Sequence, residues 1–245
     1  MKNKTVWIIG SNSDIAKVFV EKYHSCFETV VLASRDYNKI NAFSSSIDKN
    51  KLLTFELDIS DEASVNRFID IAPAPDVVIM CAGHIKYCAE NEDTSAENII
   101  KTYRTNVEGY SVFIEKLYKI LAEKKDGTIV ALSSCAGERG KASNRIYSAS
   151  KSALSTYLEG FMQMAEKYNI KTIIVKLGRV DTKMLGKVSS EFKKSFSCSG
   201  EQAADFIFKI IEKNKSNIYY YPRIWKPLTT VYKIIPLKIY NKIDF

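Results

Sequence analysis

Tyr147 and Lys151 stand four residues apart, and Ser134 precedes Tyr147 by thirteen residues. Residues four apart share one face of a helix, so the spacing predicts that the lysine ammonium lies beside the phenol. A neighbouring positive charge lowers the pKa of a tyrosine from its ordinary value of about 10, toward the range in which a general acid or base works at neutral pH. With Ser134 polarising the same substrate oxygen, the three side chains predict proton transfer at a carbonyl or alcohol. The alternative is a chance pairing with a solvated lysine and a packed tyrosine.

The first thirty residues predict a site for a pyrophosphate. Residues 5–9 form an apolar run rich in β-formers, residues 10–16 form a polar turn, and an amphipathic stretch continues to Tyr23. A strand, a tight turn and a helix place backbone N–H groups and a helix N-terminus where a pyrophosphate binds. Gly10 is the one glycine of this turn, because Asp14 and Ala16 occupy the other two glycine positions. Asp14 either opposes a phosphate or serves as a favourable acid in the first turn of the helix.

Four further segments extend this pattern, and in sequence order they are Leu57-Asp58-Ile59, Cys81-Ala82-Gly83, Thr105-Asn106-Val107 and Leu177-Gly178-Arg179-Val180-Asp181-Thr182. Together with the Gly10 turn and the Ser134, Tyr147 and Lys151 set, they resemble the short-chain dehydrogenase/reductase family. The resemblance covers nearly the whole chain, from about Thr5 to Tyr221. Two departures are Cys81 in place of an asparagine and Leu177 in place of a proline.

The resemblance implies roles for a catalytic tetrad and for a nicotinamide dinucleotide. Tyr147 would exchange the proton and Ser134 would hydrogen-bond the substrate oxygen, while Lys151 would hold the nicotinamide ribose and lower the pKa of the phenol. Asn106 would support the water that links Lys151 to solvent. The cofactor contacts implied are Gly10, Ser11, Asn12, Ser13, Asp14, Ile15, Ser34, Arg35, Asp58, Ile59, Cys81, Ala82, Gly83, Tyr147, Lys151, Gly178, Val180 and Thr182.

The end of the second apolar run predicts which dinucleotide binds. An acidic residue there would favour NAD(H), but this chain has Ser34 and Arg35, whose hydroxyl and guanidinium can hold a 2'-phosphate. Asp36 follows, and pairing of Arg35 with Asp36 at the surface is the alternative. We therefore predict NADP(H) over NAD(H), in an enzyme that reduces a carbonyl to a secondary alcohol. A non-catalytic protein that senses NADP on the same fold is the alternative function.

The alternation of apolar runs and amphipathic stretches predicts an α/β fold with one doubly wound parallel sheet. Several runs lack strict alternation, as in parallel strands covered on both faces. We expect strands at residues 5–9, 29–33, 52–57, 77–80, 128–132, 172–177 and 218–221, and helices at 14–23, 37–46, 61–71, 94–124, 145–168 and 200–213. The motifs then fall at the carboxyl ends of strands, where such sheets bind ligands.

Composition agrees with a single catalytic domain at residues 1–221, followed by a basic aromatic tail at 222–245. Five scattered cysteines and two histidines predict neither a disulfide framework nor a metal site. The scattered cysteines indicate a reducing cytoplasm, and the apolar run before Gly10 is too short for a signal peptide. The net charge of +8 is spread along the chain without a nucleic-acid-binding motif, which argues against a nucleic-acid partner.

The substrate is less clearly specified. Lysines between residues 183 and 199, with Arg139, Lys141 and Arg145, would suit an anionic substrate, or they are solvated lid residues. The tail mixes lysines with aromatic and apolar residues, as an interfacial membrane segment does, although Pro236 would interrupt a helix there. Packing on the domain, or closing a subunit interface, is the alternative for the tail. Its character also resembles family members that reduce a keto-sugar carried on a polyprenyl phosphate. By the same resemblance we expect a homodimer or homotetramer.

Overall fold

The computed structural model describes residues 1–44, 47–88, 91–181 and 196–242. Seven parallel strands form its central sheet, in the order β11-β8-β7-β4-β1-β2-β3. The strands are β1 (Thr5–Ile9), β2 (Thr29–Ser34), β3 (Leu52–Glu56), β4 (Val77–Met80), β7 (Gly127–Ser134), β8 (Ile170–Leu177) and β11 (Asn217–Tyr221). Two small sheets lie outside it, β5 (Tyr87–Cys88) with β6 (Asn91–Glu92) and β9 (Arg179–Asp181) with β10 (Ser197–Ser199). The predicted doubly wound parallel sheet is confirmed, and each predicted strand is present within two residues of its expected ends.

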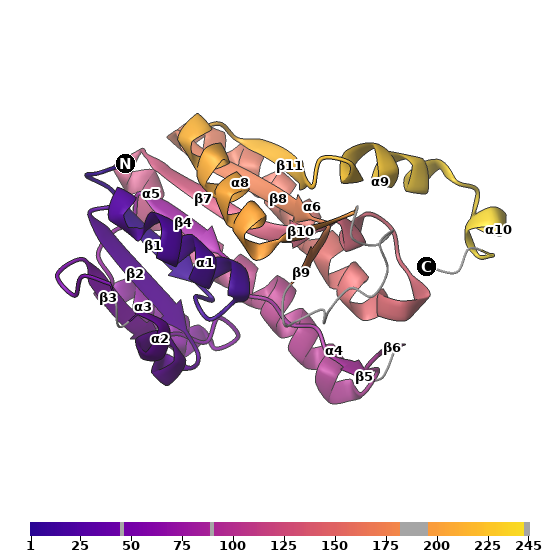
Figure 1. Ribbon diagram of the computed structural model, residues 1–245, viewed down its shortest axis with the longest axis horizontal. Helices are drawn as coiled ribbons and strands as arrows, with labels where there is room; N and C mark the ends of the chain where they lie inside the picture. Colours follow the sequence, from indigo (N-terminus) through magenta and orange to yellow (C-terminus); the bar gives the residue numbers. More distant parts are fainter. Residues whose placement is uncertain (45–46, 89–90, 182–195, 243–245) are drawn as a thin grey trace.

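Helices cover both faces of the sheet (Figure 1). They are α1 (Asp14–Tyr23), α2 (Tyr37–Ser44), α3 (Glu62–Ile71), α4 (Ala96–Tyr103), α5 (Gly109–Lys124), α6 (Arg145–Ala165), α8 (Gly200–Lys213), α9 (Trp225–Ile234) and α10 (Leu237–Tyr240). Short 3-10 turns are η1 (His24–Cys26), η3 (Cys135–Glu138), η4 (Ala142–Asn144) and η5 (Glu166–Tyr168). The helix interruption that Pro236 predicts is present, because α9 ends at Ile234 and α10 starts at Leu237.

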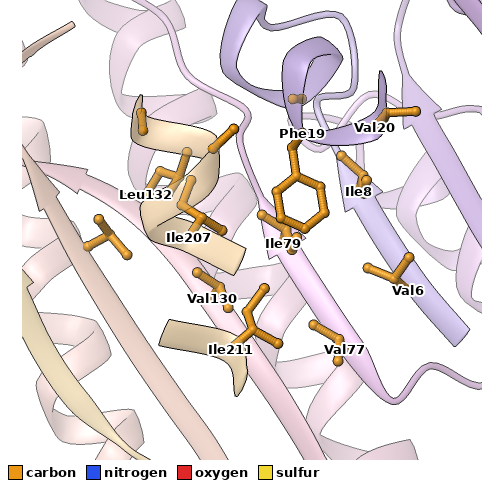
Figure 2. Packing of buried hydrophobic residues seen from close by; sticks show 14 of the residues in the cluster. Val6, Ile8, Phe19, Val20, Val77, Ile79, Val130, Leu132, Ile207 and Ile211 are labelled. Carbon is orange, nitrogen blue, oxygen red and sulfur yellow. The ribbon is translucent and has the colours of Figure 1, made fainter. Parts of the chain in front are cut away.

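Alternate side chains of each strand feed two separate apolar cores, because successive residues of a strand point to opposite faces. Val6 and Ile8 of β1 join the first core with Phe19 of α1 and Ile207 of α8, as Figure 2 shows. Trp7 of β1 points the other way, into the second core. That core packs the sheet against α3, α5 and α6 through Phe68, Phe113, Leu117, Leu154 and Leu158. Burial on both faces fixes the register of the strands and hence the edge at which their carboxyl ends meet.

One predicted helix differs in detail from the observed one. The single helix expected at residues 94–124 is α4 and α5 joined by a π-helical turn, η2 (Arg104–Glu108). Gly109, the next residue, lies so close to the loop after β3 that a Cβ atom on it would be 2.4 Å from the carbonyl oxygen of Ile59. The wider π turn brings Asn106 inward, where it is fully buried. Such turns inside α-helices often occur at functional sites.

Beyond the carboxyl edge of the sheet lie α4, the β5–β6 hairpin and α9 (Figure 1). The tail helix α9 contacts the turn after β7, where Glu138 forms ion pairs with Lys233 of α9 and, at 2.6 Å, with Lys176 of β8. The Arg139 guanidinium donates to the carbonyl oxygen of Ile235 at 2.8 Å and stacks 3.8 Å from the ring centre of Tyr240. The inner face of the described tail is therefore held against the domain. No helix in the described ranges has both the length and the apolar character needed to cross a membrane.

Candidate active site

A cleft of about 800 Å³ opens at the carboxyl edge of the sheet and extends beneath α9. It gathers most of the residues that the sequence assigns to cofactor and chemistry. Those that line it are Asn12, Ser13, Asp14, Ile15, Cys81, Ala82, Gly83, Ser134, Tyr147, Lys151, Gly178 and Val180. Thr182 lies outside the described residues, as do the lysines expected at 183–194. The remaining expected residues lie around this cleft and are described below.

The turn between β1 and α1 has the geometry of a phosphate-binding turn. Gly10 has φ of 79°, and a Cβ atom on it would be 2.5 Å from the backbone nitrogen of Ala82, so only glycine fits there. Ser13 caps α1 by accepting the N–H of Ala16 at 3.1 Å. Ser11 Oγ and Asn12 Oδ1 are buried without a hydrogen-bond partner. The turn thus approaches the next strand closely while leaving polar groups available, as a pyrophosphate site requires.

The candidate catalytic side chains converge on one part of the cleft. Ser134 ends β7, and its side chain lies close enough to the Tyr147 phenol, in the first turn of α6, to act on the pKa of that phenol. Ser134 Oγ also accepts the N–H of Ala136 at 3.1 Å, which fixes its position. The Lys151 ammonium donates to the carbonyl oxygen of Leu132 at 3.0 Å and lies 5.9 Å from the ring centre of Tyr147. The sequence spacing therefore does bring the hydroxyl, the phenol and the ammonium together.

The pKa of Tyr147 is raised, not lowered as the neighbouring Lys151 predicts. Burial raises the pKa of Tyr147 to about 12, and the nearby Ser134 hydroxyl opposes that rise only in part. Burial likewise lowers the pKa of Lys151 to about 8. Both groups lose contact with water, which disfavours the charged form of each. The four-residue spacing predicts the neighbours of the phenol but carries no information about this desolvation.

Asn106 lies below the cleft and holds one wall of it rather than lining it. Its Nδ2 donates to the carbonyl oxygen of His84 at 2.8 Å and to Ser150 Oγ at 3.1 Å, while Oδ1 accepts the N–H of His84 at 2.7 Å. A Cβ atom on Gly83 would be 3.8 Å from Asn106 Oδ1 and 3.9 Å from Lys151 Nζ. The amide therefore fixes the turn at Gly83 directly beside the lysine.

Glu92 is a residue of the site that the sequence reasoning missed. Its carboxylate is 3% exposed and accepts the backbone N–H groups of Ile146 and Tyr147, each at 2.8 Å. These N–H groups belong to the first turn of α6, where no intrahelical acceptor exists, and a carboxylate is favourable at a helix N-terminus. No local motif marks Glu92, because its partners are 54 and 55 residues away. Glu92 thus positions the turn that carries the phenol.

A second cavity adjoins the end of β2 and is lined by Arg35, Glu56, Asp58, Asp61, Ser64 and Arg67. Arg35 is exposed, and the alternative of an Arg35–Asp36 pair is not observed, because Asp36 pairs with Lys39 at 2.7 Å. Ser34 Oγ accepts a hydrogen bond from Asn12 Nδ2 at 2.8 Å, which ties the end of β2 to the turn. Asp58 Oδ1 accepts the N–H of Ser60 at 2.8 Å, and Ile59 is buried beneath.

The segment after β8 closes the other side of the cleft. Gly178 lies against the indole of Trp225, where a Cβ atom would be 2.0 Å from Nε1. That indole N–H donates to the carbonyl oxygen of Phe196 at 2.8 Å. Trp225, Leu228 and Tyr232 of α9 all line the cleft. The tail therefore forms part of the wall of the site, which the sequence did not predict.

A model of the short chain dehydrogenase family matches residues 4–193 of the 245-residue chain. The chain belongs to the short-chain dehydrogenase family. An uncharacterized oxidoreductase of Staphylococcus haemolyticus is 24% identical over 211 residues, which cover 84% of this chain and 90% of that protein. Family membership makes the chain an NAD(P)-dependent oxidoreductase.

Solved structures of the family share the fold. A short chain dehydrogenase from Burkholderia cenocepacia, crystallised in complex with NADP, superposes with a TM-score of 0.83 at 17% identity over 98% of this chain and 97% of that one. A 3-oxoacyl-acyl-carrier-protein reductase from Brucella melitensis gives a TM-score of 0.79 at 18% identity over 90% of each chain. At these identities the likeness concerns the fold alone.

The residues present fit the dinucleotide that the short-chain dehydrogenase family implies. The glycine turn with its unpartnered Ser11 hydroxyl would hold the pyrophosphate, and the cavity beside Arg35 would hold the adenosine end. Tyr147, Lys151 and Val180 line the part of the cleft that remains for the nicotinamide end. Asp14, in the first turn of α1 and in the cleft lining, is the one feature of the turn whose charge opposes a phosphate.

Proposed function

We propose that this short-chain dehydrogenase uses NADPH to reduce a carbonyl compound reversibly to a secondary alcohol, with Tyr147 as the proton donor. The observation that carries the proposal is that Ser134, Tyr147 and Lys151 line one cleft, with Lys151 Nζ 5.9 Å from the ring centre of Tyr147. Nicotinamide, when bound, supplies or accepts the hydride. The protein's own side chains transfer the proton and stabilise the charge on the substrate oxygen.

Tyr147 and Ser134 act on the substrate oxygen. Because burial holds the pKa of Tyr147 at about 12, the phenol carries its proton at neutral pH and can donate it to a developing alkoxide. The Ser134 hydroxyl donates to the same oxygen and stabilises the negative charge that grows there. A neutral phenol favours reduction, and oxidation of the alcohol gains as the pH rises.

Lys151 and Asn106 support the return of the proton. Lys151 has a pKa of about 8, so its protonated and neutral forms interconvert near physiological pH. Asn106 holds the turn at Gly83 and His84 beside Lys151 through two hydrogen bonds to the His84 backbone, and a third bond ties it to Ser150 of α6. We propose that this fixed turn orders the path by which Lys151 exchanges protons with solvent.

We propose NADP(H) over NAD(H) as the cofactor. Arg35 is exposed at the end of β2 and is not paired with Asp36, so its guanidinium is available to a 2'-phosphate. The neighbouring carboxylates Glu56, Asp58 and Asp61 oppose that phosphate. Arg67, the other guanidinium of this cavity, pairs with Asp61 at 3.9 Å, so we assign the phosphate to Arg35. Thr182 is proposed to contact the carboxamide of the same cofactor.

The substrate that we propose is a keto-sugar of glycan precursor synthesis. Support comes from the mixed polar and aromatic lining, in which Arg139, Lys141 and Asn144 share the cleft with Trp225 and Tyr232. The test is NADPH consumption with matched panels of keto-sugars, small ketones and steroid ketones, with identification of the alcohol product. Preferential turnover of a steroid or fatty ketone would contradict the substrate, and no NADPH consumption alongside tight NADPH binding would favour a sensor.

We further propose that the enzyme works at the cytoplasmic face of a membrane through the outer side of its tail. That side exposes Val231, Ile234, Leu237 and Ile239, with Ile234 75% and Leu237 65% exposed, and lysines flank them. Flotation with phosphatidylglycerol vesicles tests this in the full chain. Ile234→Glu should abolish vesicle binding. Ile71 of α3 is also 65% exposed, and Ile71→Glu should leave vesicle binding unchanged. Wild-type protein that does not bind the vesicles contradicts the proposal.

A homodimer or homotetramer is proposed to form through the helices α4, α5 and α6. Ile99, Ile100 and Tyr103 give α4 an exposed apolar face of the kind that subunit contacts cover. Light scattering after size-exclusion chromatography tests this, with Ile100→Glu as the variant. A wild-type monomer at micromolar concentration would contradict it.

A further inference from the structure

The part of the cleft beyond Tyr147 combines aromatic side chains with positive charge. Trp225 and Tyr232 come from α9, Lys141 comes from the loop before α6, and Arg179 comes from β9. Among the described residues that line the whole cleft, Asp14 is the one carboxylate, and it belongs to the turn at the other end. This part of the cleft therefore combines cationic and aromatic side chains, and none of the described carboxylates lines it.

Arg179 has an unused hydrogen-bond donor in this place. Its Nε is buried and has no hydrogen-bond partner, although buried polar groups are nearly always paired. Burial raises the pKa of the Tyr87 phenol, and the Arg179 guanidinium lies close enough to oppose part of that rise. Tyr87 in turn contributes to the raised pKa of Tyr147. Arg179 therefore belongs to the surroundings of the reacting groups, and an acceptor from a bound molecule would satisfy its Nε.

Lys141, from the loop before α6, lines the same cleft. Its ammonium lies 5.6 Å from the ring centre of Tyr232, and burial lowers its pKa. Cys135, which follows Ser134, lies within electrostatic reach of Lys141 and of Tyr147. An anion placed here would stabilise an ammonium that burial otherwise disfavours. Arg139 is different, because its guanidinium already holds the tail carbonyl oxygens.

We infer that Lys141 and Arg179 form a subsite for an anionic group of the substrate, a phosphate or a carboxylate. The substrate would then be a carbonyl compound that carries such an anion at a distance from the carbon that is reduced. Arginine presents a planar set of donors that matches either oxyanion, and the lysine adds a point charge. The inference rests on the proposed reductase function and specifies which class of carbonyl compound the cleft selects.

The test uses the full-length protein saturated with NADPH, so that the phosphate sites of the cofactor are filled. Inorganic phosphate and acetate are titrated separately, and the fluorescence of bound NADPH reports binding. We expect saturable binding of at least one anion, weakened about tenfold by Arg179→Met or by Lys141→Met, as the loss of one charge-assisted contact implies. Lys226→Met, exposed on α9 and outside the cleft lining, should bind as wild type does.

Turnover supplies the second measurement, with dihydroxyacetone against dihydroxyacetone phosphate and ethyl acetoacetate against acetoacetate as neutral and charged pairs. Faster turnover of dihydroxyacetone phosphate would identify a phosphate subsite, and faster turnover of acetoacetate a carboxylate subsite. The ratio of kcat/KM for the charged compound to that for its neutral partner should fall in Arg179→Met. NADPH affinity and thermal unfolding show that the variants fold. A wild-type complex that reduces neutral ketones but binds neither anion overturns the subsite alone. A protein that fails to bind or oxidise NADPH overturns the reductase instead.

Discussion

The carboxylate of Glu92 accepts the backbone N–H of Tyr147 at 2.8 Å, so a residue of the β5–β6 hairpin holds the helix turn that carries the phenol. Glu92→Gln keeps the size of the side chain but removes its charge and one acceptor. We expect kcat to fall about tenfold with little change in the KM for NADPH, because a small displacement of Tyr147 affects the transition state most. Steady-state kinetics checks this, with the exposed Glu97→Gln as control. Equal kcat in both variants would remove Glu92 from the site.

The contrast between Glu92 and Gly10 shows what the sequence can predict. The Gly10 turn joins consecutive elements, so its residue types predict its geometry. Glu92 acts on a helix 55 residues away, and only the packing of the hairpin against α6 reveals it. The raised pKa of Tyr147 and the α9 wall of the cleft belong to the same class, since both depend on burial by distant segments.

Gly10→Ala should destabilise the fold and weaken NADPH binding. The φ of 79° and the 2.5 Å approach to the Ala82 nitrogen leave no space for a Cβ atom, and such strain costs on the order of 1–3 kcal/mol. Urea unfolding measures it. Gly160→Ala is the matched control, because Gly160 lies exposed in α6 with nothing within 4 Å and alanine should stabilise a helix there by about 1 kcal/mol. Equal effects of the two substitutions would contradict this account.

Arg35→Ala should remove the preference for NADPH. The guanidinium is the one cation that we assign to the 2'-phosphate beside three carboxylates, so its loss should weaken NADPH binding at least tenfold while NADH binding stays nearly constant. Isothermal titration with both cofactors checks this, with the exposed Lys51→Ala as control. A wild-type protein that binds the two equally would sink the assignment.

Lys151 should make the stability of the cofactor-free protein depend on pH. Its pKa falls from 10.5 to about 8 on folding, so the unfolded state binds more protons between these values and the contribution of Lys151 to the free energy of unfolding rises with pH. Below about pH 8 the buried ammonium costs on the order of 3 kcal/mol.

Lys151→Met removes this dependence. The gain in free energy of unfolding of the variant over wild type should be larger at pH 7 than at pH 10, and the two gains should differ by about the same 3 kcal/mol. Urea unfolding of both proteins at the two pH values measures it, with Lys119→Met on the exposed side of α5 as the matched control. A difference that is the same at both pH values would show that Lys151 is not desolvated as described.

The most direct test of the account is Tyr147→Phe, which removes the proton and keeps the ring. Single-turnover NADPH oxidation with a reducible carbonyl compound should slow by roughly a hundredfold to ten-thousandfold. The dissociation constant for NADPH, measured by its fluorescence, should change less than about threefold, because the ring still packs in the cleft. Turnover within a few-fold of wild type would contradict the assignment of Tyr147 as proton donor.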